Sequence, residues 1–276
     1  MLKQDVQKAI QYIEDAKAVL ITAGAGMGVD SGLPDFRGDE GFWRAYPAIK
    51  ELGVSFEDMA DPKWFEKDPY LAWAFYGHRL NLYRDTTPHN GFKMLLDLVK
   101  SKNNNYFVYT SNVDGAFQKA GFDEDRVVEV HGSIHHLQCI HNCTKEIWSA
   151  DDAKIDIDMK NFKALNLIKC KNCQKLARPN ILMFNDWAWN SKRTQKQKDR
   201  FNRWVKILKK SDTILVIIEI GAGVVIPTIR IKGNTLAKTI KSANLIRINP
   251  QNPYINESFG VSFNCGGLDG LELILR

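Results

Sequence analysis

Apolar residues gather in short continuous runs along this chain, and each run ends in glycine or polar residues. Four runs stand out, in chain order KAVLITAGAG (17–26), NYFVYTSNVDG (105–115), DTILVIIEIGAG (212–223) and ANLIRINP (243–250). Runs of this length are typical of parallel strands that are buried on both faces. Amphipathic helical patterns lie between them, for example at 90–101. The alternation predicts an α/β fold, a Rossmann-like parallel sheet with helices on both faces.

Two stretches interrupt this alternation. Residues 41–86 are rich in aromatic side chains and have a helical pattern, and residues 138–178 are bounded by cysteines. We expect them to form a smaller lobe, made of a helical insertion and a metal-binding module. The main domain would then consist of the segments 1–40, 87–137 and 179–276.

Length and composition fit an ordinary globular protein. The chain has 276 residues, of which 44% are hydrophobic, enough to fill a sizeable core. Charges run through the first 20 residues, which therefore lack the apolar centre of a secretory signal. Because we also find no apolar stretch of about 18 residues, we expect a cytoplasmic protein with no membrane span.

The positive charge is concentrated in one segment. The chain has a net charge of +6, yet residues 191–210 hold nine Lys or Arg and one Asp, so the remainder is net negative by two. Phe201, Trp204, Val205 and Leu208 recur there at helical spacing, which predicts a helix with an apolar stripe and a basic outer face. That face is either simply solvated or in contact with acidic protein, nucleic acid or a membrane surface.

Four of the five cysteines form two closely spaced pairs. Three residues separate the first pair, two separate the second, and 26 lie between the pairs, which are Cys139 with Cys143 and Cys170 with Cys173. In a reducing compartment such pairs favour zinc over disulfides. Four thiolates leave no open coordination position, so we expect one structural zinc. His141 could replace Cys139 or Cys143 as a ligand, and Cys265 is expected to be a buried small residue.

The glycine-rich segment after the first run is a candidate phosphate loop. Gly24, Gly26, Gly28 and Gly32 would let backbone N–H groups approach a pyrophosphate, although a simple tight turn would also use them. The spacing differs from the dehydrogenase fingerprint, because Val29 stands where its third glycine belongs.

Further polar residues follow the predicted strands. Asp35 and Arg37 could pair with each other, or Arg37 could hold a phosphate. Asn112 and Asp114 are turn residues or ligand contacts. His131 is a satisfied core group or, at the carboxyl edge of the sheet, a general base.

The order of these features resembles the sirtuin family of NAD-dependent protein lysine deacylases. The matching motifs run from about residue 17 to about residue 270, in the order GAG, PDFR, T-x-N-x-D, HG, two cysteine pairs, RPNILMF, IGAG and IN.

The resemblance implies a role for each matching residue. His131 would be the catalytic base, and Asn112 and Asp114 would hold nicotinamide. The remaining implied NAD contacts are Ala23, Gly24, Ala25, Gly26, Asp35, Phe36, Arg37, Ser111, Gly221, Ala222, Gly223, Asn249 and Cys265. The cysteine pairs would correspond to the family's structural zinc module.

The implied reaction consumes NAD. The amide oxygen of an acyl-lysine attacks the anomeric carbon of the nicotinamide ribose, nicotinamide leaves, and His131 deprotonates a ribose hydroxyl that then attacks the acyl group. The expected products are nicotinamide, O-acyl-ADP-ribose and free lysine, and the expected partner is an acyl-lysine protein or peptide.

The sequence departs from the family pattern at several positions. Gly28 stands where many members have Ser, Ser111 replaces Gln, and Ala222 and Gly223 replace Thr and Ser. Phe184 and Asn185 stand in the segment implied to pair with the peptide, where the family has F-G-E. These changes affect the expected contacts with ribose and peptide.

The expected acyl chain depends on a pair in the helical insertion. Tyr76 and Arg79 resemble the Y-x-x-R pair of sirtuins that remove succinyl or malonyl groups, and a guanidinium beside a phenol suits a carboxylate. Residues three apart on a helix share a face in any case, so the pair could instead pack the lobe.

Two other functions are compatible with parts of the sequence. The altered positions could favour ADP-ribosyl transfer to protein or hydrolysis of NAD. A zinc-containing nucleic-acid-binding protein is not expected, because the segment between the cysteine pairs is rich in acids and the glycine loop would have no role.

Overall fold

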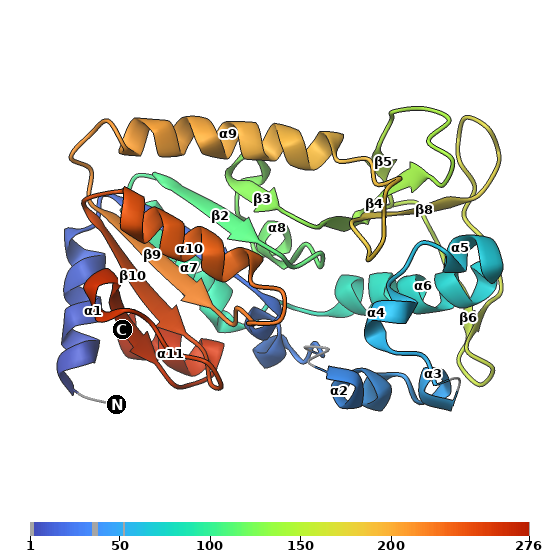
Figure 1. Ribbon diagram of the computed structural model, residues 1–276, viewed down its shortest axis with the longest axis horizontal. Helices are drawn as coiled ribbons and strands as arrows, with labels where there is room; N and C mark the ends of the chain where they lie inside the picture. Colours follow the sequence, from blue (N-terminus) through green and yellow to red (C-terminus); the bar gives the residue numbers. More distant parts are fainter. Residues whose placement is uncertain (1–2, 35–37, 52, 276) are drawn as a thin grey trace.

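The computed structural model describes residues 3–34, 38–51 and 53–275. Its largest sheet has six parallel strands in the order β11-β10-β9-β1-β2-β3 (Figure 1). The strands are β1 (Ala18–Ala23), β2 (Tyr106–Thr110), β3 (Val127–Glu129), β9 (Leu215–Ile220), β10 (Ala243–Ile248) and β11 (Gly260–Phe263). The predicted parallel α/β fold is confirmed.

Helices cover both faces of this sheet. Successive residues of a strand point to opposite faces, so each strand contributes side chains to two cores. Val19 and Ile21 of β1 belong to a core shared with α1, α7 and α11, whereas Leu20 belongs to a core shared with α9 and α10. The helices of the two layers are α1 (Lys3–Asp15), α7 (Asn90–Ser101), α11 (Gly267–Ile274), α9 (Lys192–Leu208) and α10 (Thr228–Thr239). The short α8 (Ala116–Lys119) follows β2.

The basic segment forms the long helix α9 that sequence periodicity predicts. Phe201, Trp204 and Leu208 are buried against the sheet, and Val205 is half-buried. Figure 1 shows α9 along one side of the molecule, reaching from the large sheet toward β5 of the smaller lobe.

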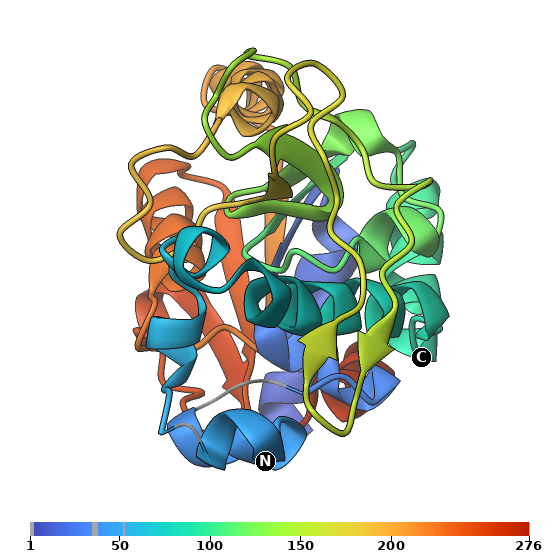
Figure 2. The ribbon, with the colours of Figure 1, turned by 90° about the vertical axis from the view of Figure 1, so that its right-hand side faces the viewer.

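The smaller lobe has its own hydrophobic core. Its helices are α2 (Gly38–Ala45), α3 (Pro47–Glu51), α4 (Phe56–Met59), α5 (Trp64–Lys67) and α6 (Pro69–Asp85). An antiparallel sheet in the order β5-β4-β8 and a hairpin of β6 and β7 complete it. These strands are β4 (Gly132–Cys139), β5 (Trp148–Ser149), β6 (Ile157–Asp158), β7 (Lys163–Ala164) and β8 (Ala177–Ile181). In Figure 2 the hairpin lies in front of α6, which it contacts.

Two strands of the three-stranded sheet cross the predicted boundaries between the main domain and the metal-binding module. β4 begins in the main-domain segment 87–137 and ends in the module at 138–178. β8 begins in that module and ends in the main-domain segment 179–276. The division into these segments stays a prediction.

Short 3-10 segments connect these elements, namely η1 (Ala25–Met27), η2 (Val29–Ser31), η3 (Glu124–Arg126) and η4 (Glu257–Phe259). Among the residues described, we find no helix both long and apolar enough to cross a membrane.

The strand order places a switch point at the centre of the large sheet. From β1 the chain moves outward on one side through β2 and β3, and on the other side through β9, β10 and β11. Ligands of such sheets bind beyond the carboxyl ends of the strands at this point. The loops that follow β1 and β9 are therefore the first place to look for a site.

Candidate functional site

The glycine loops after β1 and β9 touch through their backbones. The Gly24 N–H donates to the Ile220 carbonyl at 3.0 Å, and the Gly26 N–H donates to the Gly221 carbonyl at 3.1 Å. A Cβ atom on Gly24 would lie 2.8 Å from the Ala222 Cα, and one on Gly221, whose φ is +62°, would lie 2.4 Å from the Gly26 Cα. Only glycine fits such an approach, and the loops together form one floor.

The end of β2 is tied to the same floor. The Thr110 hydroxyl donates to the Ala23 carbonyl at 3.0 Å and accepts from the Asn112 N–H at 3.0 Å. The Asn112 side chain donates to the Gly24 carbonyl at 3.1 Å. These bonds fix Ser111, whose N–H donates to Ala23 at 3.1 Å, and Asn112 beside the first glycine loop.

Asp114 is a half-buried carboxylate next to this floor. Burial raises its pKa, and the nearby Glu129 acts in the same direction. A hydrogen bond of 2.9 Å from the Ala116 N–H lowers it, as do His135 and Arg79. The His135 ring also bonds the Asp114 carbonyl at 2.8 Å, so the backbone of the turn is held as well.

His131 lies between β3 and β4, where the large sheet meets the smaller one. Its carbonyl accepts from the Leu182 N–H at 2.9 Å, which links it to the end of β8. Burial lowers the pKa of its imidazole below the ordinary 6.5; a hydrogen bond to the Ser111 backbone raises it, and the charge of Lys198 lowers it. The net lowering favours a neutral imidazole, the form that accepts a proton.

These elements surround one cavity of about 960 Å³. The predicted site residues that line it are Gly24, Ala25, Tyr76, Arg79, Ser111, Asn112, Asp114, His131, Phe184, Gly221, Gly223 and Asn249. Most of the residues singled out at strand ends thus meet in one place, together with the pair from the helical insertion.

Several predicted residues lie behind the lining. Ala23 is fully buried in β1, and Gly26 holds the second loop through its N–H. The Ala222 carbonyl accepts from the Asn249 side chain at 2.8 Å. Cys265 packs, half-buried, at the edge of one sheet core.

Two further predictions concern loops. The Asn185 side chain is directed to Asp61, to which it donates at 3.0 Å, and its φ is +54°. Asp35, Phe36 and Arg37 lie outside the described residues.

Arg79 is held in the cavity wall by a residue that sequence reasoning missed. Its Nε and Nη2 atoms donate to the Tyr83 hydroxyl at 3.1 and 2.9 Å. Its guanidinium lies 5.3, 6.0 and 5.5 Å from the ring centroids of Phe75, Tyr76 and Tyr83. The charged group is thereby fixed by a hydroxyl and three aromatic faces.

Exposed apolar side chains at one side of the cavity were also missed. Val224, Val225 and Ile226 follow the second glycine loop and are 51%, 83% and 45% exposed. Leu182, which also lines the cavity, is 37% exposed. Apolar residues directly after a glycine turn and before Pro227, outside any strand, are the signal that could have identified this surface.

The four paired cysteines converge as predicted. Their sulfur atoms all lie within 4.8 Å of one another, with Cys139 to Cys173 at 3.7 Å and Cys143 to Cys170 at 3.6 Å. A tetrahedron with Zn–S bonds of about 2.3 Å has edges of about 3.8 Å. The group fits one structural zinc, and His141 is not among the ligand atoms gathered there.

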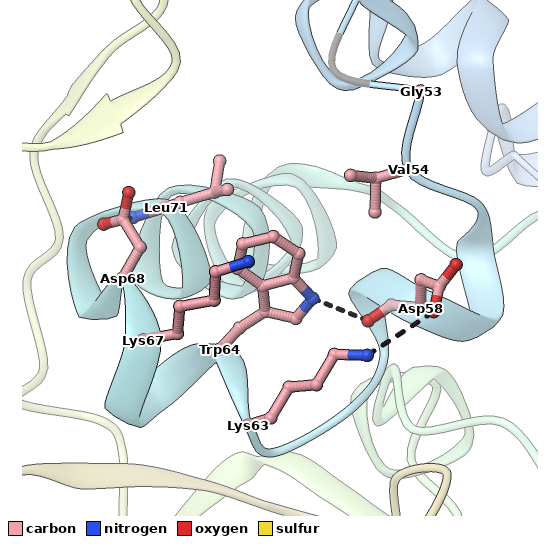
Figure 3. A pocket seen from close by; sticks show the side chains of 8 residues that line it. All are labelled: Gly53, Val54, Asp58, Lys63, Trp64, Lys67, Asp68 and Leu71. Carbon is pink, nitrogen blue, oxygen red and sulfur yellow. Dashed lines mark hydrogen bonds and ion pairs between the residues drawn. The ribbon is translucent and has the colours of Figure 1, made fainter.

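A second hollow, of about 430 Å³, lies between α4, α5 and the start of α6 (Figure 3). The Trp64 Nε1 donates to the Asp58 carbonyl at 2.6 Å, and Lys63 pairs with the Asp58 carboxylate at 3.4 Å. Lys67 lies 4.9 Å from the Trp64 ring. Side chains that bond one another line this hollow, and none of the predicted site residues is among them.

The fold and the site define a nucleotide-binding protein of the Rossmann type with a module of four cysteines that fits zinc. Comparison with known proteins agrees: the Sir2 family model matches residues 24–226. The chain belongs to the Sir2 family, and the resemblance to sirtuins is confirmed.

Individual relatives cover most of the chain. An NAD-dependent protein deacylase of Leptospira interrogans serogroup Icterohaemorrhagiae serovar Lai is 31% identical over 86% of this chain and 82% of its own. One of Aquifex aeolicus is 26% identical over 95% of both. The solved structure of a Sir2 homolog–NAD complex, 23% identical, superposes with a TM-score of 0.69 over 97% of this chain and 92% of its own, which supports the fold.

Proposed function

We propose that this protein is an NAD-dependent protein lysine deacylase. The observation that carries the proposal is the meeting of His131, Asn112 and Asp114 with the glycine floor of β1 and β9 in one cavity. A carboxylate, an amide and a neutral imidazole beside a phosphate-binding floor suit a reaction at a nucleotide sugar. The names of the relatives support the same reaction class.

The floor fits a dinucleotide. A Cβ atom at Gly24 or Gly221 would clash with the backbone of the opposite loop, which requires glycine there, whereas no atom lies within 4 Å of the Cβ position at Gly223, which lines the cavity. A floor made of backbone in this way allows the close approach of a pyrophosphate. Asn249 lies at the β10 end of the lining and Asp114 at the β2 end, which gives the two halves of NAD separate places. When bound, NAD supplies the sugar carbon that accepts the acyl oxygen and the nicotinamide that leaves.

The residues of the chain then have distinct tasks. Asn112 and Asp114, whose backbone and side chains are held by hydrogen bonds, orient the nicotinamide end. His131 takes the proton of a ribose hydroxyl, since its lowered pKa keeps it unprotonated. Apolar lining such as Leu33, Ile181 and Met183 excludes water that would otherwise hydrolyse the dinucleotide.

The substrate peptide would enter between two apolar edges. Val224, Val225 and Ile226 form one edge, and Leu182 and Phe184 form the other. Exposed apolar side chains beside a cavity mark a binding surface. An extended peptide lying there would direct its acyl-lysine toward His131.

Product analysis tests the proposal. Incubation with NAD and an acetyl-lysine or succinyl-lysine peptide should yield nicotinamide, O-acyl-ADP-ribose and free lysine, identified by mass spectrometry. His131→Ala should lower kcat/KM by about 100-fold or more, because general base catalysis is lost. Absence of acyl-ADP-ribose with every acyl chain would contradict the proposal.

We also propose a preference for acyl chains that end in a carboxylate. The support is Arg79, whose guanidinium is fixed in the cavity wall beside Tyr76. This preference is tested by measuring kcat/KM on matched acetyl and succinyl peptides for the unmodified protein and for Arg79→Met. Equal values on both peptides that the substitution leaves unchanged would exclude the preference.

A second candidate is ADP-ribosyl transfer or NAD hydrolysis in the same cavity. The support is Asn185, which stands in the segment expected to pair with the substrate peptide. Its side chain bonds Asp61 in place of facing the cavity, so this contact with a peptide would be missing. Release of nicotinamide that does not depend on peptide would support this alternative over deacylation.

A further inference from the structure

We propose that the outer face of α9 binds the phosphate backbone of a double-stranded nucleic acid. This surface is separate from the cavity and independent of the reaction there. The residues that form it, which we name the α9 cation stripe, are Lys192, Lys196, Arg203 and Lys206. All four are exposed.

The stripe follows from helix geometry. At about 100° per residue its four members fall within about 80° of arc, on the side opposite Phe201, Trp204 and Leu208. Those three residues are buried against the sheet, so the stripe faces directly away from the protein. At a rise of about 1.5 Å per residue it extends over about 21 Å.

Other cations of α9 have partners within the fold. Arg193 pairs with the buried Glu129 at 2.5 Å, and Arg200 pairs with Asp125 at 3.3 Å. In the part of the chain that the structure describes, the members of the stripe form no ion pair. Two of the helix cations are therefore used to anchor α9, and the stripe is not.

Repulsion between cations of the stripe lowers the stability of the helix. Lys192 and Lys196 are four residues apart, and Arg203 and Lys206 are three apart, so cations of each pair repel each other on neighbouring turns. The sole acid of the helix, Asp199, lies within the same arc, three residues after Lys196 and four before Arg203, and accepts a hydrogen bond from Gln195 at 2.8 Å. With four cations and one acid the face keeps a net charge of +3, whereas a face that served only solubility would carry the two signs in comparable numbers.

Other cations of the same basic segment, outside the stripe, act on the neighbouring helix. The pKa of Lys232 on α10 is lowered by its burial and further by Lys198 and Lys209. Lys209 and Lys210, both exposed, continue the positive charge beyond the end of the stripe.

A nucleic-acid duplex fits this surface better than the other polyanions. A duplex carries one negative charge per about 1.7 Å of axis, so a continuous row of phosphates can face the whole stripe. An anionic membrane surface attracts cations as well, but stable insertion of a helix also buries an apolar face, and the apolar stripe of α9 is packed in or against the core except for Ile207. Acidic proteins present separate carboxylates instead of an unbroken row.

Salt-dependent binding tests the proposal. Fluorescence anisotropy with a DNA or an RNA duplex of about 20 base pairs should give an affinity that falls with salt at a log–log slope of about 3 to 4, as expected for four contacts. Comparison of the two duplexes identifies the preferred nucleic acid.

Variants locate the surface. Lys196→Gln/Arg203→Gln/Lys206→Gln should weaken binding about 10-fold or more and reduce the slope by about 3. The matched control Lys93→Gln/Lys154→Gln/Lys160→Gln removes the same charge from exposed positions outside α9 and should change the affinity less than about twofold. Thermal melting verifies that both variants fold, and Lys206→Gln alone should reduce the slope by about 1.

Three results would overturn the proposal. One is the absence of duplex binding by the unmodified protein at low salt, and another is an equal loss in the stripe and control variants. The third is tighter binding of polyglutamate, or of vesicles of anionic lipid, than of either duplex.

Discussion

His131 and Lys198 are coupled through space, although they lie on different elements. Burial and the Lys198 charge hold the pKa of His131 below 6.5. A base acts only when unprotonated, so activity should persist as the pH falls past 6.5 and be lost as it falls through the lowered pKa. Lys198→Gln removes a charge that lowers this pKa and should move the acid limb of kcat/KM toward higher pH.

The neighbouring Lys196 provides the control for this prediction. It lies on the same helix and is exposed, and it is not among the groups that affect His131. Lys196→Gln should leave the pH profile in place. An identical profile for Lys198→Gln and the unmodified protein would show that the coupling has no effect on catalysis.

Tyr83 is expected to position Arg79 for an acidic acyl chain. Its hydroxyl accepts two N–H groups of the guanidinium, and hydrogen bonds to charged groups are worth about 1.5 to 3 kcal/mol. Tyr83→Phe should raise KM for a succinyl peptide about 10-fold while kcat stays within about twofold. The KM for an acetyl peptide should be unaffected.

Tyr70→Phe is the matched substitution, on the same helix but 40% exposed and outside the cavity. Equal effects of the two substitutions on succinyl and acetyl peptides would argue against a positioning role for Tyr83.

The sequence predicted which residues gather at the cavity better than the residues that support them. His131, Asn112 and Asp114 were singled out because they follow predicted strands, and they line the cavity; their roles rest on the resemblance and stay predictions. Tyr83 lies four residues after Arg79 in an aromatic helix, and its sequence context is the same as that of a packing residue. Whether its hydroxyl meets a guanidinium depends on rotamers, which the sequence pattern does not determine.

At the scale of elements, the contact between the β1 and β9 loops supports the whole site. Gly221→Ala would place a Cβ 2.4 Å from Gly26 in a left-handed backbone conformation. We expect a loss of about 2 kcal/mol or more in stability, together with weaker NAD binding, because the loops must separate. Thermal melting and NAD titration measure both effects.

Gly223→Ala tests the same loop without the clash. No atom lies within 4 Å of the Cβ position at Gly223. The melting temperature of Gly223→Ala should therefore stay within about 2 °C of that of the unmodified protein. Equal destabilisation by both substitutions would contradict the contact between the loops.

Elements with long apolar runs were predictable, and those defined by pairing were not. The runs at 17–26 and 212–223 contain β1 and β9, which are buried throughout. β11 has four residues, begins with glycine and owes its place to pairing with β10. β4 and β8 pair across 37 intervening residues, and no local periodicity reports such a contact.

At the scale of the whole molecule, the cysteine cluster joins the ends of distant segments. Cys139 ends β4, and Cys170 and Cys173 precede β8, whose continuation at Leu182 bonds the His131 carbonyl. Removal of zinc should therefore loosen the β4–β8 sheet and abolish activity while much of the six-stranded sheet persists.

Metal analysis and calorimetry test this prediction. The purified protein should contain one zinc per chain, and chelation should produce a separate unfolding transition at lower temperature. Cys143→Ser should reproduce the effect without chelator. Full activity in protein freed of zinc would contradict a structural role.

The order of strands in the large sheet also has a consequence for synthesis on the ribosome. β1 ends at Ala23, but its neighbour β9 begins only at Leu215. Until β9 has emerged, one edge of β1 is left without its native partner, and unpaired strand edges promote aggregation. The glycine floor is complete only once residue 223 of the 276 has been made, so a product terminated before β9 lacks one of its two loops.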